Sequence, residues 1–460
     1  MPLPTTFAGD SSRGAGQWTG SYGAAPIGGP YTIQSYQDTA TYASTIGPDN
    51  RTQSLVVDSL GNVYSTGYVT NGTLAATSIV LNKQSPSGTL TWSVGITGSS
   101  SSGFNSISSM KLGIDSSNNI YVMGWLFATG YGANVMKFNS SGTLLWSYIL
   151  TGSPSPFFNG IAIDSSGNVY LSGNNGGSIP IIAKLNSSGA WQWGYQLNGT
   201  MGQLSSGVAL DSSGNVNVAA GNTFFQMSSS GSLNWYSYTN SGPQFASVCC
   251  DSSKNVYFVG TTGITSRTSS GTWRWGYTYT DGTYGTSLNG SVIDSSNNIY
   301  VAGQLAGPGY VGATLKIDSS GNVLNSGCMY SPMQNSQYGA SLNDVAFDIS
   351  GNTYWGGYAQ TSQFYTDAKS NKFYYNNSII VKDTSAFQGT HAGTYTMNSY
   401  LSVSWNKSRT LSKASVSSTA ITGGGSLTTI SSSNWATQTV TTNNALSGGQ
   451  PGIVAALVTI

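Results

Sequence analysis

The sequence contains few charged residues. Asp, Glu, Lys and Arg together make up 7% of its 460 residues, and the net charge is +1, whereas about 25% of a typical globular chain is charged. So few cations leave no basic patch to neutralise the phosphates of a nucleic acid, and the same scarcity argues against electrostatic attachment to anionic lipid. We therefore expect neither nucleic acid nor a lipid surface among the partners.

Residues for acid–base chemistry are also scarce. Glutamate is absent, and the one histidine, His391, stands in a connector rich in Gly and Thr. Because a repeated turn uses seven of the fifteen carboxylates, a glycosidase-type pair would have to come from a remainder such as Asp281, Asp344 and Asp367. No glycine-rich loop ends in Lys-Ser or Lys-Thr, so nucleotide binding has no support. We expect a protein that is not an enzyme and has no catalytic or cofactor-binding residues.

The three cysteines, Cys249, Cys250 and Cys328, are too few for a disulfide framework. Adjacent residues of a strand point to opposite faces, so Cys249 and Cys250 are expected as small buried residues on two different faces. No window approaches eighteen apolar residues, and a membrane span is not expected. The first residues, MPLPTTFAGDSSRGAGQW, lack the basic start and apolar stretch of a secretory signal.

What the sequence does contain is a sevenfold repeat of Asp, two mostly small residues, then Gly, Asn or Lys, then Asn, a mostly β-branched residue and usually Tyr. The spacing runs from 57 residues, between Asp58 and Asp115, down to 40, between Asp211 and Asp251. A repeat of this length indicates a closed or stacked architecture. The seven copies begin at Asp58, Asp115, Asp164, Asp211, Asp251, Asp294 and Asp348.

Each copy predicts two strands joined by a tight turn. The residues one and three places before the Asp are mostly apolar, as in Leu55 and Val57, and this alternation is typical of a β-strand. A second strand follows the turn, with Tyr six places after the Asp in six copies and Asn217 in the fourth. Bulky residues alternate on both faces of this strand, which predicts a small sheet packed between two others.

The Asp itself is interpreted as turn chemistry. An Asp side chain bonds the backbone two residues on, and the Gly or Asn three places later tolerates a positive φ angle. The alternative is calcium at one or more turns, because Asp-x-Ser-x-Asn is similar to the start of a calcium loop. An EF-hand loop ends in Glu at its twelfth place, whereas the twelfth residue counted from Asp164 is Asn175. We expect structural turns with no metal or other cofactor.

A second hairpin in each unit completes a set of four strands. It is clearest in the segment from Asn139 to Trp146, which reads Asn-Ser-Ser-Gly-Thr-Leu-Leu-Trp, and in the segment from Asn186 to Trp193. Four-stranded units repeated radially form a β-propeller. The seventh copy lacks a clear fourth strand, so residues 29–33 are predicted to supply it and close the ring. The alternative fourth strand is residues 393–397.

The pattern resembles the seven-bladed propeller repeats, rich in Asp-x-x-Gly-Asn-x-Tyr, of bacterial surface proteins and phage structural proteins. The expected fold is therefore an all-β, seven-bladed β-propeller of four-stranded blades. Residues 1–28 are expected to form an extended N-terminal arm, 29–390 the propeller, and 391–460 a small C-terminal β region for docking or assembly. The resemblance covers roughly residues 30–390 and leaves the function open.

Aromatic residues outside the repeat register are the candidates for ligand or host contact, because strand connections commonly carry binding residues. They are Trp125, Phe127, Tyr131, Phe157, Phe158, Tyr310 and Tyr365. Copies four and five have shortened connections, so an uneven face is expected.

Three functions are compatible with these observations. The favoured one is a virion structural or attachment protein, such as a phage tail, fibre or surface component. It would bind other virion proteins or copies of itself through residues 1–28 and 391–460, with a host glycan as a further ligand. The alternatives are an extracellular or cell-surface adhesin or lectin, and an enzyme on a propeller scaffold, such as a lyase or lactonase.

Overall fold

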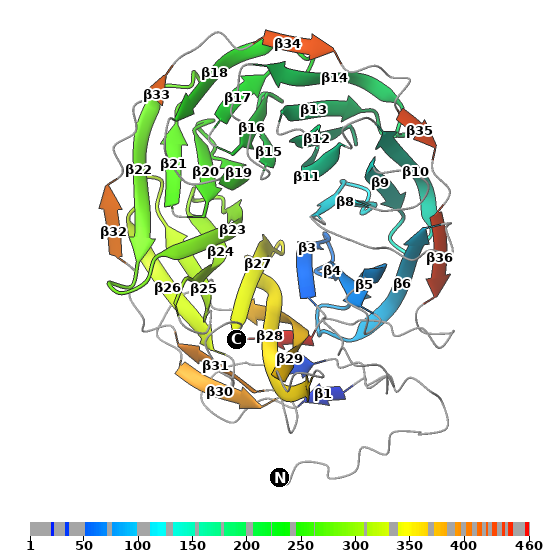
Figure 1. Ribbon diagram of the computed structural model, residues 1–460, viewed down its shortest axis with the longest axis vertical. Helices are drawn as coiled ribbons and strands as arrows, with labels where there is room; N and C mark the ends of the chain where they lie inside the picture. The colour runs from blue at the N-terminus through cyan, green and yellow to red at the C-terminus, as the bar shows by residue number, and fades with distance from the viewer. Residues whose placement is uncertain are drawn as a thin grey trace.

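The computed structural model is a ring of seven β-sheets around a central axis (Figure 1). It contains no helix within the described residues. The structure describes residues 20–22, 33–35, 51–70, 76–98, 111–125, 132–151, 156–175, 179–198, 206–221, 223–239, 245–261, 263–307, 311–330, 339–366, 372–383, 392–396, 402–406, 412–415, 420–421, 426–429, 435–437, 440–444 and 456–459.

Each sheet is one blade of a β-propeller, and blades 1 to 7 contain the repeat copies in chain order. In blades 1 to 6 four consecutive strands follow one another from the axis outwards in antiparallel order. Blades 1 to 3 are β3 (Arg51–Val57), β4 (Val63–Thr70), β5 (Ala76–Gln84) and β6 (Leu90–Gly98); β7 (Lys111–Ile114), β8 (Ile120–Trp125), β9 (Gly132–Phe138) and β10 (Leu144–Thr151); β11 (Phe157–Ile163), β12 (Val169–Asn174), β13 (Pro180–Leu185) and β14 (Trp191–Asn198).

The remaining blades repeat this arrangement, and blade 7 contributes three consecutive strands. They are β15 (Ser206–Leu210), β16 (Val216–Ala220), β17 (Thr223–Met227) and β18 (Leu233–Thr239); β19 (Phe245–Cys250), β20 (Val256–Gly260), β21 (Gly263–Arg267) and β22 (Trp273–Thr280); β23 (Thr286–Ile293), β24 (Ile299–Leu305), β25 (Val311–Ile317) and β26 (Val323–Tyr330); β27 (Ala340–Phe347), β28 (Thr353–Thr366) and β29 (Lys372–Asp383). The predicted all-β, seven-bladed propeller is thereby confirmed.

Of residues 29–33, predicted as the fourth strand of blade 7, only Ile33 is described, and it does not occupy the fourth place. That place is taken by β37 (Ala456–Thr459), which runs parallel to β29. The N-terminal strand β2 (Ile33–Ser35) joins the same sheet one position further out, antiparallel to β37, and β1 (Gly20–Tyr22) lies beyond it. The apolar residues 456–458 offer a better sheet partner than the Gly-Pro sequence at 29–30, because proline has no amide hydrogen to donate to a ladder.

The C-terminal strands do not form a separate sheet. Those from β31 onwards lie on the outer edges of the blades, in reverse order from blade 6 back to blade 1 and then on blade 7, and we call this series the C-terminal belt (Figure 1). It consists of β31 (Ser402–Asn406), β32 (Ser412–Ser415), β33 (Ala420–Ile421), β34 (Ser426–Thr429), β35 (Trp435–Thr437), β36 (Val440–Asn444) and β37.

The belt follows from the chemistry of sheet edges. The outermost strand of each blade presents unpaired N–H and C=O groups, which need partners. The belt supplies them through antiparallel pairing on blades 1 to 6, and β30 (Ala392–Thr396) adds one more strand outside β31 on blade 6. The expected C-terminal β region is therefore, in its described strands, part of the propeller sheets.

The hydrophobic core lies between the blades. Tyr64 and Leu81 of blade 1 pack in one cluster with Ile120, Val122 and Phe138 of blade 2, and all five are fully buried. Similar clusters occupy the next junctions. Both faces of a blade are thus buried, which explains why bulky residues alternate on both faces of the second strand in each repeat.

Candidate functional site

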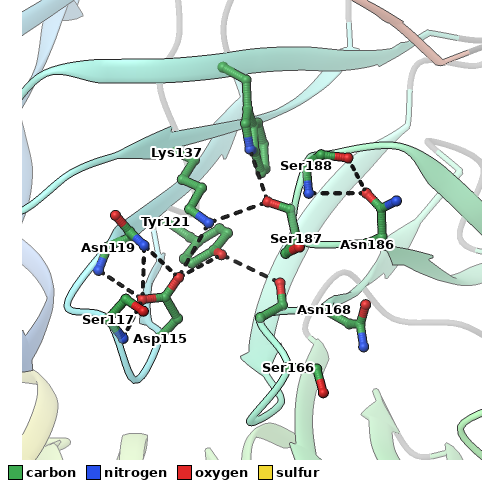
Figure 2. A network of polar contacts seen from close by, with 12 residues as sticks. Asp115, Ser117, Asn119, Tyr121, Lys137, Ser166, Asn168, Asn186, Ser187 and Ser188 are labelled. Carbon is green, nitrogen blue, oxygen red and sulfur yellow. Dashed lines mark hydrogen bonds and ion pairs between the residues drawn. The ribbon is translucent and has the colours of Figure 1, made fainter.

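The Asp of each repeat organises a turn at one end of the first two strands. In blade 2, Asp115 Oδ1 accepts hydrogen bonds from the backbone N–H of Ser117 (3.0 Å) and of Asn119 (2.9 Å), as Figure 2 shows. Its Oδ2 accepts from Asn119 Nδ2 (2.9 Å) and from the Tyr121 hydroxyl (3.0 Å). The Asp, Asn and Tyr of the repeat are therefore three parts of one hydrogen-bonded unit.

The same unit recurs around the ring with small variations. Asp58, Asp164 and Asp348 each accept from the backbone two and four residues on, from the Asn side chain and from the Tyr hydroxyl. Asp251 and Asp294 bond their Asn and Tyr in the same way. At Asp211 the Tyr is replaced by Asn217, and among the described residues the carboxylate accepts only from residues 213 and 215.

The third residue after each Asp has a positive φ angle. It is Gly in blades 1, 3, 4 and 7, for example Gly214 at 75°. In blades 2, 5 and 6 it is Asn118, Lys254 or Asn297, at 60° to 64°. The turn thus needs a left-handed backbone at this place, which Gly adopts freely and Asn tolerates.

The turn geometry determines what these carboxylates can bind. In blade 2 both oxygens of Asp115 are already taken up by hydrogen bonds, and Lys137 Nζ lies 3.3 Å from Oδ2 as an additional cation. No group of three or more His, Cys, Asp or Glu side chains suited to a metal occurs among the described residues. This arrangement is that of a structural turn and differs from an open calcium loop.

A lysine of the third strand was missed by the sequence interpretation. Lys83, Lys137 and Lys184 each place Nζ over the repeat Tyr ring of their own blade, at 4.8–5.1 Å from its centroid. Each also donates to a backbone carbonyl in the outer hairpin of the next blade, as Lys137 does to Ser187 (3.3 Å) in Figure 2. The sequence does contain this pattern, because a Lys occurs at the equivalent third-strand position of blades 1, 2, 3, 6 and 7.

A tryptophan of the fourth strand bonds the same carbonyl. Trp146 Nε1 donates to Ser187 O (3.4 Å), and Trp92, Trp193, Trp235 and Trp275 make the equivalent bond to the next blade at 3.0–3.3 Å. Blades 6 and 7 have no such Trp within their described strands, but in blade 7 Lys382 donates to Pro86 O of blade 1 (3.2 Å) and continues the series across the closure. The repeat residues thus join neighbouring blades.

A different polar cluster lies on the innermost strands of blades 7, 1 and 2. Asp344 Oδ2 accepts hydrogen bonds from the Ser54 hydroxyl and from the Leu55 N–H (3.3 Å). Lys111 Nζ of blade 2 lies 3.5 Å from the same oxygen, and the Ser54 Oγ accepts from the Leu112 N–H (3.1 Å). We call Ser54, Lys111 and Asp344 the axial cluster.

The axial cluster occupies one repeat position. Ser54, Lys111 and Asp344 each stand four residues before the turn Asp, where other blades have Gly160, Gly207, Ser247 and Gly290. A Cβ on Gly160 would lie 3.0 Å from the Gly207 Cα, and one on Gly290 would lie 2.8 Å from the Asp344 Cα. The inner strands therefore approach one another closely at this level, and the small residues permit it.

Two amide side chains also join the inner strands of neighbouring blades close to the axial cluster. Asn343 Nδ2 donates to Thr52 O of blade 1 (2.7 Å), and Asn289 Nδ2 donates to Leu342 O of blade 7 (3.0 Å). Both amides are the extra residue of a β-bulge in their strand. The axial cluster is thus embedded in a network that joins blades 6, 7, 1 and 2.

The carboxylates that the sequence analysis considered for a glycosidase-type pair do not form one in the described part of the chain. Asp344 is committed to the axial cluster, and Asp281 accepts from the backbone N–H groups of Thr283 and Tyr284 in its own turn. Asp367 and His391 lie outside the described residues. Catalysis by paired carboxylates therefore has no geometric support among the described residues.

The structure places the aromatic candidates in different surroundings. Phe158, a predicted contact residue, is fully buried in the core between blades 2 and 3 and does not reach the surface. Phe157, the first residue of β11, is half-buried. Trp125 ends β8 and Tyr365 lies in β28. Phe127, Tyr131 and Tyr310 lie outside the described residues.

The cysteines follow the strand alternation. Cys249 packs in the cluster shared with blade 6, whereas Cys250 packs against the cluster shared with blade 4. Cys249 and Cys328 are buried, and all three cysteines carry thiols. Burial raises the pKa of Cys249 to about 12, so this thiol is not a reactive nucleophile at neutral pH.

Three solved structures that resemble the chain do so at low sequence identity. A protein of unknown function from Bacteroides caccae matches 60% of this chain and 93% of its own, with 11% identity and a TM-score of 0.38. A streptogramin B lyase matches 71% and 93%, with 14% identity and a TM-score of 0.49. A structure of YCF48 bound to D1 peptide matches 72% and 95%, with 10% identity and a TM-score of 0.43.

No family model matches the sequence, and no curated protein matches it. The described residues include no helix with the length and apolar character that crossing a membrane requires. At the identities given above, none of the three similar structures assigns a function to this chain.

Proposed function

We propose that the protein is a non-enzymatic structural or attachment component of a virion, such as part of a phage tail, fibre or surface. The propeller serves as a rigid display module, and residues 1–28 and 391–460 contact other virion proteins or further copies of the chain. The resemblance of the Asp-x-x-Gly-Asn-x-Tyr repeat to repeats of phage structural proteins supports this role.

The observation that carries the proposal is the position of the strands from both ends of the chain. β1, β2 and β37 all lie at the outer edge of blade 7. Attachment through this edge leaves the connections of the other six blades available for display. The Lys and Trp bonds tie blades 1 to 6 in succession and blade 7 to blade 1, which is the rigidity that a display module needs.

The test is localisation on purified particles. Antibodies raised against the recombinant chain are used for immunogold electron microscopy of purified virions, and the particle proteins are identified by mass spectrometry. We expect labelling at a fixed position on the particle. Recovery of the chain only as a soluble monomer, absent from every purified particle, would refute the proposal.

A second candidate function is glycan binding by an adhesin or lectin, and the uneven length of the connections favours it. Two residues separate β16 from β17 and β20 from β21, whereas six separate β8 from β9. The longer connections contain or adjoin Trp125, Phe127, Tyr131 and Tyr310. A glycan array with the wild type and with Trp125→Ala and Tyr310→Ala tests this function, and binding that both variants retain would assign it to other residues.

A further inference from the structure

Arg267, the last residue of β21 in blade 5, is a buried cation without a counter-charge in the described part of the chain. Its side chain is 1% exposed. Nη1 donates to the Gly271 carbonyl (3.0 Å), but Nε and Nη2 have no hydrogen-bond partner among the described residues. Leaving such donors unpaired inside a protein is costly, so this arrangement calls for a ligand.

Two aromatic rings hold the guanidinium in place. Its Cζ lies 5.0 Å from the centroid of the Phe224 ring in blade 4 and 5.5 Å from that of the Trp273 ring in β22. Cation–π contacts of this kind orient the group without satisfying its N–H donors. Burial lowers the pKa of Arg267 to about 10, and the group is therefore still charged at neutral pH.

The junction between blades 4 and 5 also departs from the repeat. At the junctions of blades 1–2, 2–3, 3–4 and 5–6 the repeat Tyr packs in one cluster with an apolar residue at the end of the next blade's third strand, as Tyr64 does with Phe138 and Tyr170 with Met227. Blades 1 and 7 have Gln84 and Asp383 at that place. Blade 4 has Asn217 in place of the Tyr, and blade 5 has Arg267 in place of the apolar residue. Both replacements occur at the same junction, where two polar side chains stand in place of a Tyr and an apolar residue.

The two unpaired nitrogens point to a particular class of ligand. Nε–H and Nη2–H form one edge of the planar guanidinium, with parallel donors whose spacing matches the two oxygens of a carboxylate or similar oxyanion. We propose that the junction between blades 4 and 5 binds a small monovalent planar oxyanion through the Nε and Nη2 donors of Arg267. The bound anion neutralises the guanidinium and stabilises the ring, and this role does not depend on the proposed virion function.

Thermal unfolding of the full chain at constant ionic strength tests the site, with sodium formate replacing sodium fluoride in steps. The wild-type melting temperature is expected to rise with the logarithm of the formate concentration, as ligand linkage requires. Arg267→Met is expected to lose this dependence, and it should fold because Phe138, Leu185, Met227 and Ile317 occupy the same place in other blades. Arg267→Lys keeps the charge but lacks the paired donors, so it should also lose the dependence.

Lys184→Met is the matched control. It removes one cation of the repeat elsewhere on the ring, so it should keep the formate dependence of the wild type. A formate effect of equal size in the wild type and in Arg267→Met would overturn the proposal. So would an Arg267→Met protein that melts above the wild type at every formate concentration, because that result identifies Arg267 as an unliganded buried charge. An equal effect of chloride on the wild type would refute the selectivity for a planar oxyanion.

Discussion

Lys111 and Asp344 form an ion pair of 3.5 Å between the innermost strands of blades 2 and 7, which are not neighbours in the ring. Ser54 of the intervening blade 1 bonds the same carboxylate and also the backbone of blade 2. Three blades, including the first and the last, are thus joined through one side chain. The axial cluster therefore stabilises the closure of the ring on the axis, while β37 completes blade 7 at its outer edge.

Asp344→Asn is expected to destabilise the protein by about 1–3 kcal/mol, because it leaves the partly buried Lys111 without its counter-charge. Lys111→Met should have a smaller effect, and the double variant should recover part of the loss. Chemical denaturation of the three variants measures this coupling. Strictly additive effects would show that the two side chains do not interact.

The Asp of the repeat turn and the Asp of an outer hairpin are expected to contribute differently to stability. Asp115→Asn replaces the carboxylate by an uncharged amide. The Oδ2 of that carboxylate accepts from Asn119 and Tyr121 and lies close to the Lys137 cation. We expect a cost of about 1–3 kcal/mol in unfolding free energy, since buried donors lose their acceptor. The measurement is urea denaturation.

Asp318→Asn is the matched control for that variant. Asp318 makes the same kind of turn in the outer hairpin of blade 6, where it is more exposed. In blades 2 and 3 an Asn already forms the equivalent turn, and Asn139 accepts from the N–H groups of Ser141 and Thr143. The cost should be below about 1 kcal/mol, typical of a single exposed hydrogen bond. Equal costs for the two variants would contradict this account.

Acid should weaken the turns. Burial acts to raise the pKa of Asp115, but hydrogen bonds from Asn119 and Tyr121 and the charge of Lys137 outweigh it and hold the pKa below its ordinary value. The pKa of Asp318 is lowered in the same way by Asn322, Ser320 and Lys413. Because the folded-state pKa is the lower one, the stabilisation is complete above the unfolded value of about 3.9 and is lost as the pH falls through the folded-state value.

Melting temperatures measured between neutral pH and strong acid test this expectation. The wild type should show a decline that begins near the unfolded pKa, and Asp115→Asn should show a shallower one because it cannot take up that proton. Identical slopes in the two proteins would assign the acid sensitivity to other groups.

The sequence was sufficient to predict the seven blades because each repeat has its own complete local signal. Asp58, Asn62 and Tyr64 interact within seven residues, so their pattern can be read without knowing the fold. Closure was predicted wrongly because the pairing of β29 with β37 joins residues more than seventy positions apart, through backbone atoms that carry no sequence signature.

The axial cluster was missed for a related reason. Ser54, Lys111 and Asp344 are ordinary residues at one repeat position, and only the ring brings them together. Asp344 stood out in the sequence merely as a carboxylate outside the turns. Arg267 was missed because a sequence does not show whether a charged side chain has a partner. The structure shows that Nε and Nη2 of Arg267 have none among the described residues.

Deletion of residues 446–460 should open blade 7. The variant loses β37 and exposes the edge of β29, and we expect a lower melting temperature and concentration-dependent association, because unpaired strand edges pair with other chains. Sedimentation or light scattering measures the association. Deletion of residues 1–28 is the control, since it removes β1 but retains the pairing of β29 with β37. A shortened chain that stays monomeric with an unchanged melting temperature would show that β37 is dispensable.

The turn glycines offer a test of the packing between blades. Gly189 and Gly214 both have positive φ angles, 83° and 75°, so alanine at either place should cost about 1–2 kcal/mol in backbone strain. At Gly189 the new Cβ would also lie 2.3 Å from the Tyr148 ring, whereas at Gly214 nothing lies within 4 Å. Gly189→Ala should therefore cost about 1–3 kcal/mol more than Gly214→Ala, as measured by urea denaturation. Equal costs would mean that the Tyr148 ring moves aside without loss, and that the outer hairpins contribute little to holding the blades together.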